Sequence, residues 1–254
     1  MALVDLHTHP SAHGETGFSL ENVEQFVLRG IARGCSDLGF SDHDMFLAGL
    51  KQEILANLQA KYPQINLRLG LEVDYRPGTE AEIRQKLAPF PFDYLIGSVH
   101  EVGGWIFDHP DYMDGYKKYR GDDLYREYFT LVGQAARSGL FQVIGHPDVI
   151  RVFGFKCESP LLELARPALE AIRDAGLAIE INTNGRYKPV GDFYPAREVL
   201  AEAFRLGIPV TLGSDAHEAA NVARDLEEAV DLLKEIGYRS IVSFQKGERI
   251  AYPL

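Results

Sequence analysis

The residues of this chain that could do chemistry are mainly histidines, and each follows a short apolar run. Imidazole groups serve as metal ligands and as general acids or bases. The same residue type therefore recurs at the same structural position, which predicts one shared site. The histidines in question are His7 and His9 after ALVDL, His43 after LGFSD, His100 after YLIGSV, His146 after FQVIG and His217 after VTLGSD.

Two acidic residues occupy equivalent positions, Glu72 in LGLEVD and Asp215 in GSDAH, and His13 lies in the loop after the first run. So many imidazoles in one pocket are costly to bury when neutral and repel one another when charged, unless cations lie between them. The H-x-H spacing near the start and the D-x-H spacing near the end each place two ligands on one side of a strand. The number of ligands exceeds the four that one tetrahedral ion takes, so we expect two or three divalent ions (Zn, Mn or Fe) bridged by Glu72.

A regular alternation of helices and strands would position these side chains. Five times an amphipathic stretch ends in Gly and is followed at once by a short apolar run. Gly relieves the left-handed backbone after a helix, and a short apolar run fits a strand buried on both faces. The five runs are CSDLGF, LFQVIG, LAIEIN, IPVTLG and YRSIVSF. With ALVDL, NLRLGLEV and FDYLIGSV they predict about eight strands, mostly in a parallel sheet.

The length of 254 residues fits a small α/β barrel, and no linker divides the chain, so we predict a single domain over residues 1–254. Helix starts are predicted at Ser19, at Ser159 with Pro160, and at Pro195. Residues 101–130 are rich in aromatic residues and Gly, and predict a long loop followed by a helix. In parallel α/β folds the carboxyl ends of the strands meet on one face, where the histidines and acids would gather.

Composition excludes several classes of partner. The chain has 26 Lys and Arg against 37 Asp and Glu, a net charge of −11, which argues against nucleic-acid binding. It has no basic and apolar leader and no apolar run of about 18 residues, so we expect no membrane partner. Cys35 and Cys157 lack the spacing of a redox or zinc motif, which favours a reducing, cytoplasmic location.

The motifs DLHTH, SDHD, GLEVD with GSVH and GHPD, and GSDAH resemble those of the polymerase and histidinol phosphatase (PHP) family of metal-dependent phosphoesterases. The resemblance covers nearly the whole chain. It implies a distorted (β/α)7 TIM-like barrel with a trinuclear metal centre, and leaves SIVSF as a spare C-terminal strand. It also implies three ligand sets: His7, His9, Glu72 and Asp215; Glu72, His100 and His146; and His13, His43 and His217.

Glu72, Asp215 and His217 are the predicted catalytic residues, and His109 is left over as a structural or loop-lining residue. The segments GSVHEVGGWIFDHPDY, GHPDVIRVFG and EINTNGRYKPVGDFYP are similar to those of family members that act on L-histidinol phosphate. The implied reaction is hydrolysis of this small phosphorylated metabolite to L-histidinol and phosphate, a step of histidine biosynthesis, by a metal-activated hydroxide.

An acidic protein needs local cations to bind a phosphate. Arg151, Arg186 and Lys188 follow predicted strands and could contact its oxygens, although solvated loop cations are an equal alternative. Trp105 and Asp108 could receive the imidazole and the amine of the substrate. The alternative for such an aromatic cluster is packing within its own loop.

Three other functions are compatible with the same residues. The first is a phosphoesterase for a nucleotide, an oligonucleotide end or phosphotyrosine. The second is an amidohydrolase-like enzyme that cleaves C–N bonds; it is disfavoured because Glu72 stands where that class uses a modified lysine. The third is a metal-binding module without turnover, which the complete ligand set disfavours.

Overall fold

The computed structural model describes residues 3–254, so Ala2 of the predicted run ALVDL lies outside the described residues. The chain divides into two compact units that are interleaved in sequence. Unit 1 comprises the chain up to Val73, Phe90–Ile96 and Val210–Leu254, and unit 2 comprises Asp74–Pro89 and Gly97–Pro209. The single domain over residues 1–254 stays a prediction.

Unit 1 holds the first three strands, the ninth strand and the C-terminal hairpin. Its elements are β1 (Leu3–Asp5), α1 (Leu20–Ala32), β2 (Cys35–Phe40), the 3-10 helix η1 (Asp44–Gly49), α2 (Gln52–Lys61), β3 (Asn66–Asp74, whose last residue is in unit 2), β9 (Val210–Gly213), η5 (Ala219–Asn221), α7 (Leu226–Ile236), β10 (Ser240–Gln245) and β11 (Glu248–Pro253).

Strands β1, β2 and β3 of unit 1 are parallel, as the alternation predicted. β1 pairs with β2, and β2 pairs with β3. On the other side of β1, the Leu6 amide donates to the Leu212 carbonyl over 3.0 Å, which continues the sheet to β9. β4 (Tyr94–Ser98) begins in unit 1 and ends in unit 2. The carboxyl ends of β9, β1, β2 and β3 therefore lie along one edge.

Helix α1 shows why these residues form these elements. Ser19 caps its first turn by accepting a hydrogen bond from the Asn22 amide, as predicted. Val23, Phe26, Val27 and Gly30 recur at helical spacing and are buried. A Cβ on Gly30 would lie 3.1 Å from Leu38 of β2, so glycine lets the helix approach the sheet closely.

Tyr94 fills the interior of this sheet. A Cβ on Gly39 would lie 2.0 Å from the Tyr94 hydroxyl, and one on Gly70 would lie 2.3 Å from its ring. The hydroxyl donates to the Leu6 carbonyl, directly before the first histidine of the chain. Any larger residue at Gly39 or Gly70 would displace this ring and the segment that it supports.

The C-terminal strand behaves as the spare strand that the resemblance implied. β10 is buried, but it pairs antiparallel with β11 in a separate two-stranded sheet. The turn of this hairpin is fixed to Asp93, whose carboxylate accepts from the Lys246 and Leu69 amides over 2.9 Å each. The parallel strands thus end before β10.

Unit 2 holds the middle of the chain. Its elements are α3 (Glu80–Leu87), the end of β4, β5 (Glu101–Val102), β6 (Trp105–Ile106), η2 (Pro110–Lys118), α4 (Asp123–Arg137), β7 (Val143–Ile144), η3 (Val149–Arg151), α5 (Leu161–Asp174), β8 (Ala178–Asn182), η4 (Asn184–Tyr187) and α6 (Arg197–Arg205).

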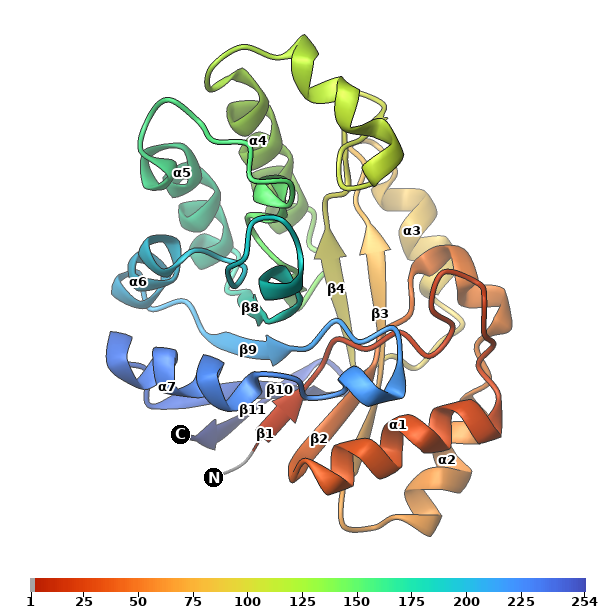
Figure 1. The fold of residues 1–254 in the computed structure, drawn as a ribbon. Helices are drawn as coiled ribbons and strands as arrows, with labels where there is room; N and C mark the ends of the chain where they lie inside the picture. Colours follow the sequence, from red (N-terminus) through yellow and green to blue (C-terminus); the bar gives the residue numbers. More distant parts are fainter. Residues whose placement is uncertain (1–2) are drawn as a thin grey trace. The chain divides into compact units, whose positions relative to one another are not determined.

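Within unit 2, the Gly145 amide donates to the Gly97 carbonyl over 3.1 Å, and β7 pairs parallel with β8. Helix α4 packs against α5, and α5 against α6, so the three helices lie side by side (Figure 1). No helix in the described part of the chain has the length and the apolar character needed to cross a membrane.

Three predictions of local structure need correction. Helix α5 begins at Leu161, with Pro160 rather than Ser159 as its cap, because Ser159 donates its hydroxyl to Asp122 instead. Helix α6 begins at Arg197, two residues after Pro195, which follows a cis peptide bond. Within residues 101–130, the expected loop contains the β5–β6 hairpin and η2 before α4 begins.

Candidate metal centre

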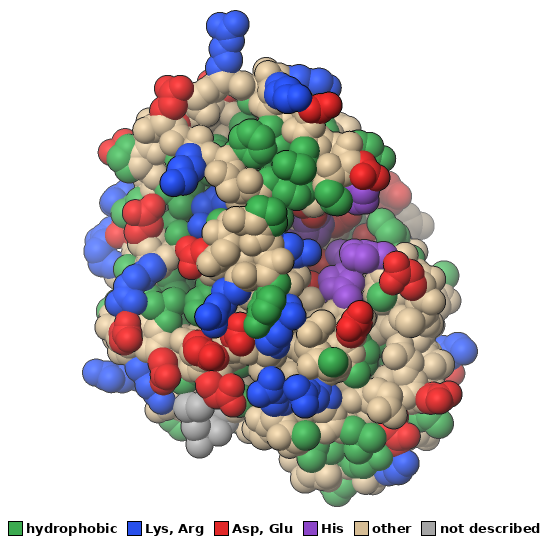
Figure 2. Space-filling model, viewed as in Figure 1, with side chains coloured by type: hydrophobic (Ala, Val, Ile, Leu, Met, Phe, Trp, Pro, Cys, Tyr) green, Lys and Arg blue, Asp and Glu red, His purple; other side chains and the backbone are tan. Residues whose placement is uncertain are grey.

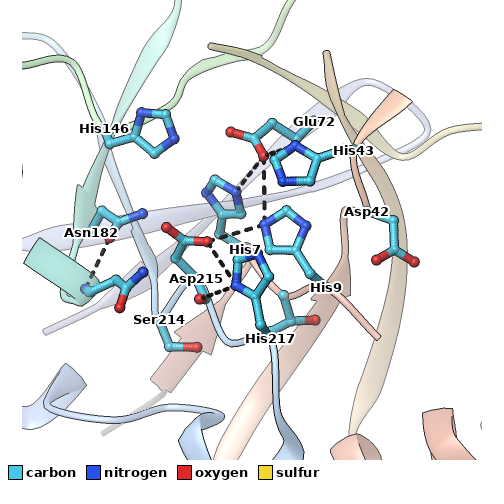
Figure 3. Close-up of polar contacts among 12 residues, drawn as sticks. His7, His9, Asp42, His43, Glu72, His146, Asn182, Ser214, Asp215 and His217 are labelled. Carbon is cyan, nitrogen blue, oxygen red and sulfur yellow. Dashed lines mark hydrogen bonds and ion pairs between the residues drawn. The ribbon is translucent and has the colours of Figure 1, made fainter. Parts of the chain in front are cut away.

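In unit 1 the first two histidines contact the carboxylate of Glu72. His7 and His9 follow β1, and their Nε2 atoms lie 3.3 and 3.6 Å from Glu72 Oε2 (Figure 3). The His43 Nδ1 atom lies 2.9 Å from the same oxygen. The Glu72 amide donates to the Ser41 and Asp42 carbonyls over 3.1 Å each, which fixes this residue beside His43. One buried carboxylate oxygen thus faces three imidazoles.

The loop after β9 brings Asp215 and His217 to the same group. Asp215 Oδ1 lies 3.2 Å from His9 Nε2. The His217 ring stacks on that of His9, with centroids 4.4 Å apart. Asp215 has a φ of +52°, a backbone conformation that is costly for a residue with a side chain and that recurs at functional sites.

Two groups of three ligand-type atoms within 4.8 Å of one another lie entirely in unit 1: His7, His9 and Glu72, and His9, His43 and His217. His9 belongs to both. His13 belongs to neither of these two groups; it is exposed, and its ring centroid lies 4.4 Å from that of His217. The resemblance implied an ion held by His13, His43 and His217, which stays a prediction; the rings of His9 and His13 lie equally near His217, and the His9 ring is the nearer of the two to His43.

The unsatisfied nitrogens of this cluster fit a metal ion. Among residues 3–254, the buried His9 ring nitrogens and His217 Nε2 have no hydrogen-bond partner. The His217 Nδ1 donates to the Asp215 carbonyl over 3.1 Å, so its Nε2 carries the lone pair. Burial lowers the pKa of His9 well below its usual value, and this outweighs the contact with Asp215. Neutral imidazoles with buried lone pairs are the donors that zinc-like ions prefer.

The two carboxylates of the cluster complement these donors. Burial alone would raise the pKa of Asp215, but His7, His9 and His217 hold it well below its usual range. Glu72 is almost fully buried. Divalent cations can balance the negative charge of carboxylates that are buried among imidazoles.

Two further aspartates support the loops that carry these residues. Asp5 accepts from the Ser214 amide over 2.9 Å, from the Ser214 hydroxyl over 2.6 Å and from the Ala223 amide over 2.8 Å. Asp42 accepts from the Ser11 amide over 2.9 Å and from the Ser11 hydroxyl over 2.8 Å. Burial raises the pKa of Asp5 and of Asp42 to about 6, although these hydrogen bonds oppose the rise.

Unit 2 holds the other two predicted ligands and brings them together. His100 Nε2 and His146 Nε2 are 3.3 Å apart. His100 Nδ1 donates to Asp74 Oδ1 over 2.6 Å, which leaves the lone pair on Nε2 and orients it toward His146. A carboxylate that accepts from the far nitrogen of an imidazole is the usual support of a metal-binding histidine.

His146 is held in a strained backbone conformation. Its φ is +23°. Its amide donates to the buried carboxylate of Glu180 over 2.8 Å, and its carbonyl accepts from the Tyr128 hydroxyl over 3.5 Å. Strain at His146 in unit 2 therefore parallels strain at Asp215 in unit 1.

Arg151, one of the predicted phosphate ligands, is largely occupied by internal partners. Its Nε donates to Asp148 over 2.8 Å, one Nη donates to the Phe193 carbonyl over 2.7 Å, and the other lies 3.4 Å from Asp192. The Asp148 carboxylate also accepts from the Ala196 amide over 2.8 Å. Arg151 therefore ties the segment after β7 to the segment before α6, which is a positioning role.

The other predicted cations, Arg186 and Lys188, are exposed. The Arg186 guanidinium lies over the ring of Phe193, 5.3 Å from its centroid, so Arg151 and Arg186 both contact the same short segment. On the face shown in Figure 2, Lys and Arg side chains lie among Asp and Glu, and histidine side chains reach the surface.

Trp105 and Asp108, the predicted contacts of the organic end of the substrate, are both half-buried in unit 2. Trp105 Nε1 donates to the Tyr112 carbonyl over 2.9 Å, and its ring stacks on Tyr119 at 5.7 Å. Packing thus accounts for much of the Trp105 ring. His109 accepts from the Asp111 amide over 3.2 Å and caps η2, in keeping with the structural role expected of it.

The sequence analysis missed Asp5, Asp42, Asp74 and Glu180. A signal was present for three of them, because each lies one or two residues from a predicted ligand: Asp5 before His7, Asp42 before His43, and Asp74 after Glu72. Glu180 had no such signal, since its partner His146 is 34 residues away.

Comparison with known proteins places the chain in a class. Residues 5–184 match the PHP domain model, so the chain belongs to the PHP domain family. A relative from Deinococcus radiodurans, named a probable histidinol-phosphatase, is 37% identical, and the match covers 94% of this chain and 95% of the relative. The histidinol-phosphatase of Lactococcus lactis subsp. lactis is 27% identical, with 94% and 92% covered.

A solved structure gives the fold. The histidinol phosphate phosphatase of Lactococcus lactis, determined with zinc, L-histidinol and phosphate, matches with a TM-score of 0.79 and 24% identity over 98% of each chain. The prediction of a distorted (β/α)7 TIM-like barrel of the PHP type is confirmed by this match and by the family.

Proposed function

We propose that this chain is a metal-dependent phosphomonoesterase that hydrolyses L-histidinol phosphate to L-histidinol and phosphate. The observation that carries the proposal is the unit 1 cluster, in which Glu72 and Asp215 lie among imidazoles, and the buried ring nitrogens of His9 and Nε2 of His217 have no hydrogen-bond partner within residues 3–254. The substrate is supported by relatives that are named histidinol-phosphatases and match nearly the full length of the chain.

The ions belong to the same proposal. We assign one set of ligands to His7, His9, His43, Glu72, Asp215 and His217 in unit 1, with His13 at its exposed side, and a second to His100 and His146 in unit 2. Two or three divalent ions match this number of ligands. Zinc has the strongest support, because it is present in the structure of the Lactococcus lactis relative.

Divalent ions held there lower the pKa of water and offset the negative charge of the phosphoryl oxygens. The residues of the chain place the ligand atoms and keep their lone pairs available. Glu72 presents one oxygen to three imidazoles and is placed to bridge. The neutral state of His9 keeps its lone pair available, and Asp74 does the same for His100 by accepting its Nδ1 proton.

Cations of the chain balance the phosphate dianion. Arg186 and Lys188 are exposed and near neighbours in sequence, and we propose them as the direct phosphate contacts. Arg151 supports Arg186 indirectly, because both contact Phe193. Asp108 and Trp105 are proposed for the amine and the imidazole of the substrate, with Asp108 as the counter-ion.

The test is phosphate release from L-histidinol phosphate, phosphoserine, phosphotyrosine, a nucleoside monophosphate and p-nitrophenyl phosphate, with metal supplied. We expect kcat/KM for L-histidinol phosphate to exceed each of the others at least about tenfold, which is about 1.4 kcal/mol of transition-state stabilisation. Equal rates on all five would make the chain a general phosphatase and contradict the substrate assignment.

The remaining alternatives have their own outcomes in the same experiment. Preference for the nucleotide or for phosphotyrosine would point to another PHP phosphoesterase. Hydrolysis of an N-acyl amino acid without phosphate release would favour the C–N hydrolase. The absence of turnover on every substrate, with ions bound, would favour the metal-binding module. A cytoplasmic location remains part of the proposal.

A further inference from the structure

Asp5 and Asp42 share one arrangement in unit 1. Each is a buried carboxylate that accepts two hydrogen bonds from one serine, its amide and its hydroxyl. Each serine stands in a loop that carries proposed metal ligands: Ser214 directly precedes Asp215, and Ser11 lies between His9 and His13. We call these two arrangements the Asp–Ser clamps.

The Asp5 clamp holds both ends of one loop. Besides Ser214, Asp5 accepts from the Ala223 amide over 2.8 Å, and Asp215 and His217 lie between these two residues. Asp215 and Ala223 have φ values of +52° and +55°. A loop with two residues in left-handed backbone keeps that conformation only when its surroundings fix it, and one carboxylate does so here.

The Asp42 clamp joins the loops after β1 and β2. Asp42 directly precedes His43, whereas Ser11 belongs to the loop of His9 and His13. Figure 3 shows the Asp42 carboxyl group and Ser214 beside the histidine cluster and not at its centre. Neither aspartate belongs to the groups of ligand atoms found in the described residues. Their contact with the cluster is through the backbone.

We propose that Asp5 and Asp42 are positioning residues that preorganise the metal centre by clamping its loops, and that their hydrogen-bond geometry, not their charge, is what the site requires. The inference deepens the proposed function, because it rests on the assignment of these histidines and Asp215 as metal ligands. A residue that supports a metal ligand typically changes metal affinity by about 10–100-fold when it is replaced.

The two clamps differ in a way that makes this proposal testable. Asp42 faces one amide and one hydroxyl. An asparagine there can accept from the Ser11 amide with its oxygen and donate to the Ser11 hydroxyl with its nitrogen, because a hydroxyl both donates and accepts. Asp42→Asn therefore removes the charge and retains the clamp.

Asp5 offers no such exchange. One of its oxygens accepts from the Ser214 amide and the other from the Ala223 amide. A backbone amide can only donate, so either orientation of an asparagine would point its NH₂ group at an N–H group. Asp5→Asn therefore removes the charge and also breaks the clamp. A role based on charge alone predicts the same loss from both variants.

The chain also offers a matched control. Asp122 of unit 2 accepts from the Ser159 amide over 2.9 Å, from the Ser159 hydroxyl and from the Glu158 amide over 2.8 Å. Both amides donate to one Asp122 oxygen and the hydroxyl donates to the other, so an asparagine could keep these hydrogen bonds, and an alanine is needed to break them. No proposed metal ligand lies in this segment of the sequence. Asp122→Ala breaks these hydrogen bonds away from those loops and is the control for Asp42→Ala.

The experiment measures zinc affinity of the metal-free full chain by competition with a chromophoric chelator, after circular dichroism shows that each variant is folded. We expect Asp5→Asn and Asp42→Ala to weaken zinc binding by about 10–100-fold, and Asp42→Asn and Asp122→Ala to stay within about threefold of wild type. If an Asp5 variant does not fold, Ser214→Ala takes its place, and Ser11→Ala does so for Asp42. Each serine variant removes a single hydrogen bond of its clamp, so we expect a smaller loss of zinc affinity.

Three results would overturn the proposal: zinc binding by Asp42→Asn as weak as by Asp42→Ala, zinc binding by Asp5→Asn equal to that of wild type, or zinc binding by Asp122→Ala as weak as by Asp42→Ala. The affinities are measured without substrate. Wild-type protein that binds zinc but releases no phosphate from L-histidinol phosphate would therefore overturn the proposed function alone, and leave the clamps to be judged by the affinities.

Discussion

A histidine cluster of unit 1 and an arginine network of unit 2 differ in how their buried polar groups are paired. In the cluster, the ring nitrogens of His9 and Nε2 of His217 have no hydrogen-bond partner among the described residues. In unit 2, Arg151 is matched by Asp148, Asp192 and a backbone carbonyl. Buried polar groups are normally paired within the protein. The histidine cluster of unit 1 therefore fits a ligand that is not part of the protein, such as a metal ion. Arg151 of unit 2 finds its partners within the chain.

The largest effect should come from removing the central carboxylate of unit 1. Glu72→Gln takes away the oxygen that faces His7, His9 and His43. We expect kcat/KM for L-histidinol phosphate to fall about 1,000-fold, or about 4 kcal/mol. Glu82→Gln on exposed α3 is the control and should leave the rate unchanged. If kcat/KM of Glu72→Gln stays within tenfold of wild type, Glu72 does not belong to the metal centre.

The complete network of unit 2 should respond in stability. Arg151→Met leaves the buried Asp148 without its cation, and we expect a loss of about 3 kcal/mol in the free energy of unfolding, measured by urea denaturation. Lys117→Met, at an exposed pair with Asp114, should cause no measurable loss. If Arg151→Met is as stable as wild type but raises KM, this arginine is a substrate contact and not a support.

Removal of metal should distinguish the units directly. Because the ring nitrogens of His9 and Nε2 of His217 have no hydrogen-bond partner within residues 3–254, we expect the chelated protein to exchange its amide hydrogens faster in residues 6–13 and 214–223 than in residues 148–151 and 192–196. Added zinc at 100 times its dissociation constant should restore about 2.7 kcal/mol of stability. If amide exchange changes equally in both sets of segments, the difference between the units does not depend on metal.

The strands and the histidine cluster could be predicted from the sequence, because both depend on local patterns. The Gly that ends each helix and the apolar run that follows it predicted the strands, and the histidine at each strand end predicted the cluster. His7 and His9 lie two residues apart after one strand, so strand geometry predicted that they lie on the same side, and both lie near Glu72.

What could not be predicted depends on partners that are distant in sequence. Asp5 and Ser214 are 209 residues apart, and no local pattern joins them. Arg151 contacts Asp192, which lies 41 residues later and has no local signal either; the role of Arg151 as a phosphate contact stays a prediction. The β5–β6 hairpin was missed because its strands are two residues long, too short to show alternation.

The smallest effect should come from the exposed cations of unit 2. Arg186→Ala is expected to raise KM for L-histidinol phosphate about tenfold, or about 1.4 kcal/mol, with little change in kcat, because the guanidinium is exposed and lies over the ring of Phe193. Initial rates at varied substrate concentration measure this. A fall in kcat with unchanged KM would contradict a role in phosphate binding.

Zinc stoichiometry tests the central claim most directly. Metal-free protein is dialysed against buffered zinc, and zinc per chain is measured by elemental analysis for wild type and for His9→Ala, because His9 belongs to both ligand groups of unit 1. The account predicts two or three ions per wild-type chain, and at least one fewer for the variant. One ion or none in the wild type, or the same number in the variant, would contradict it.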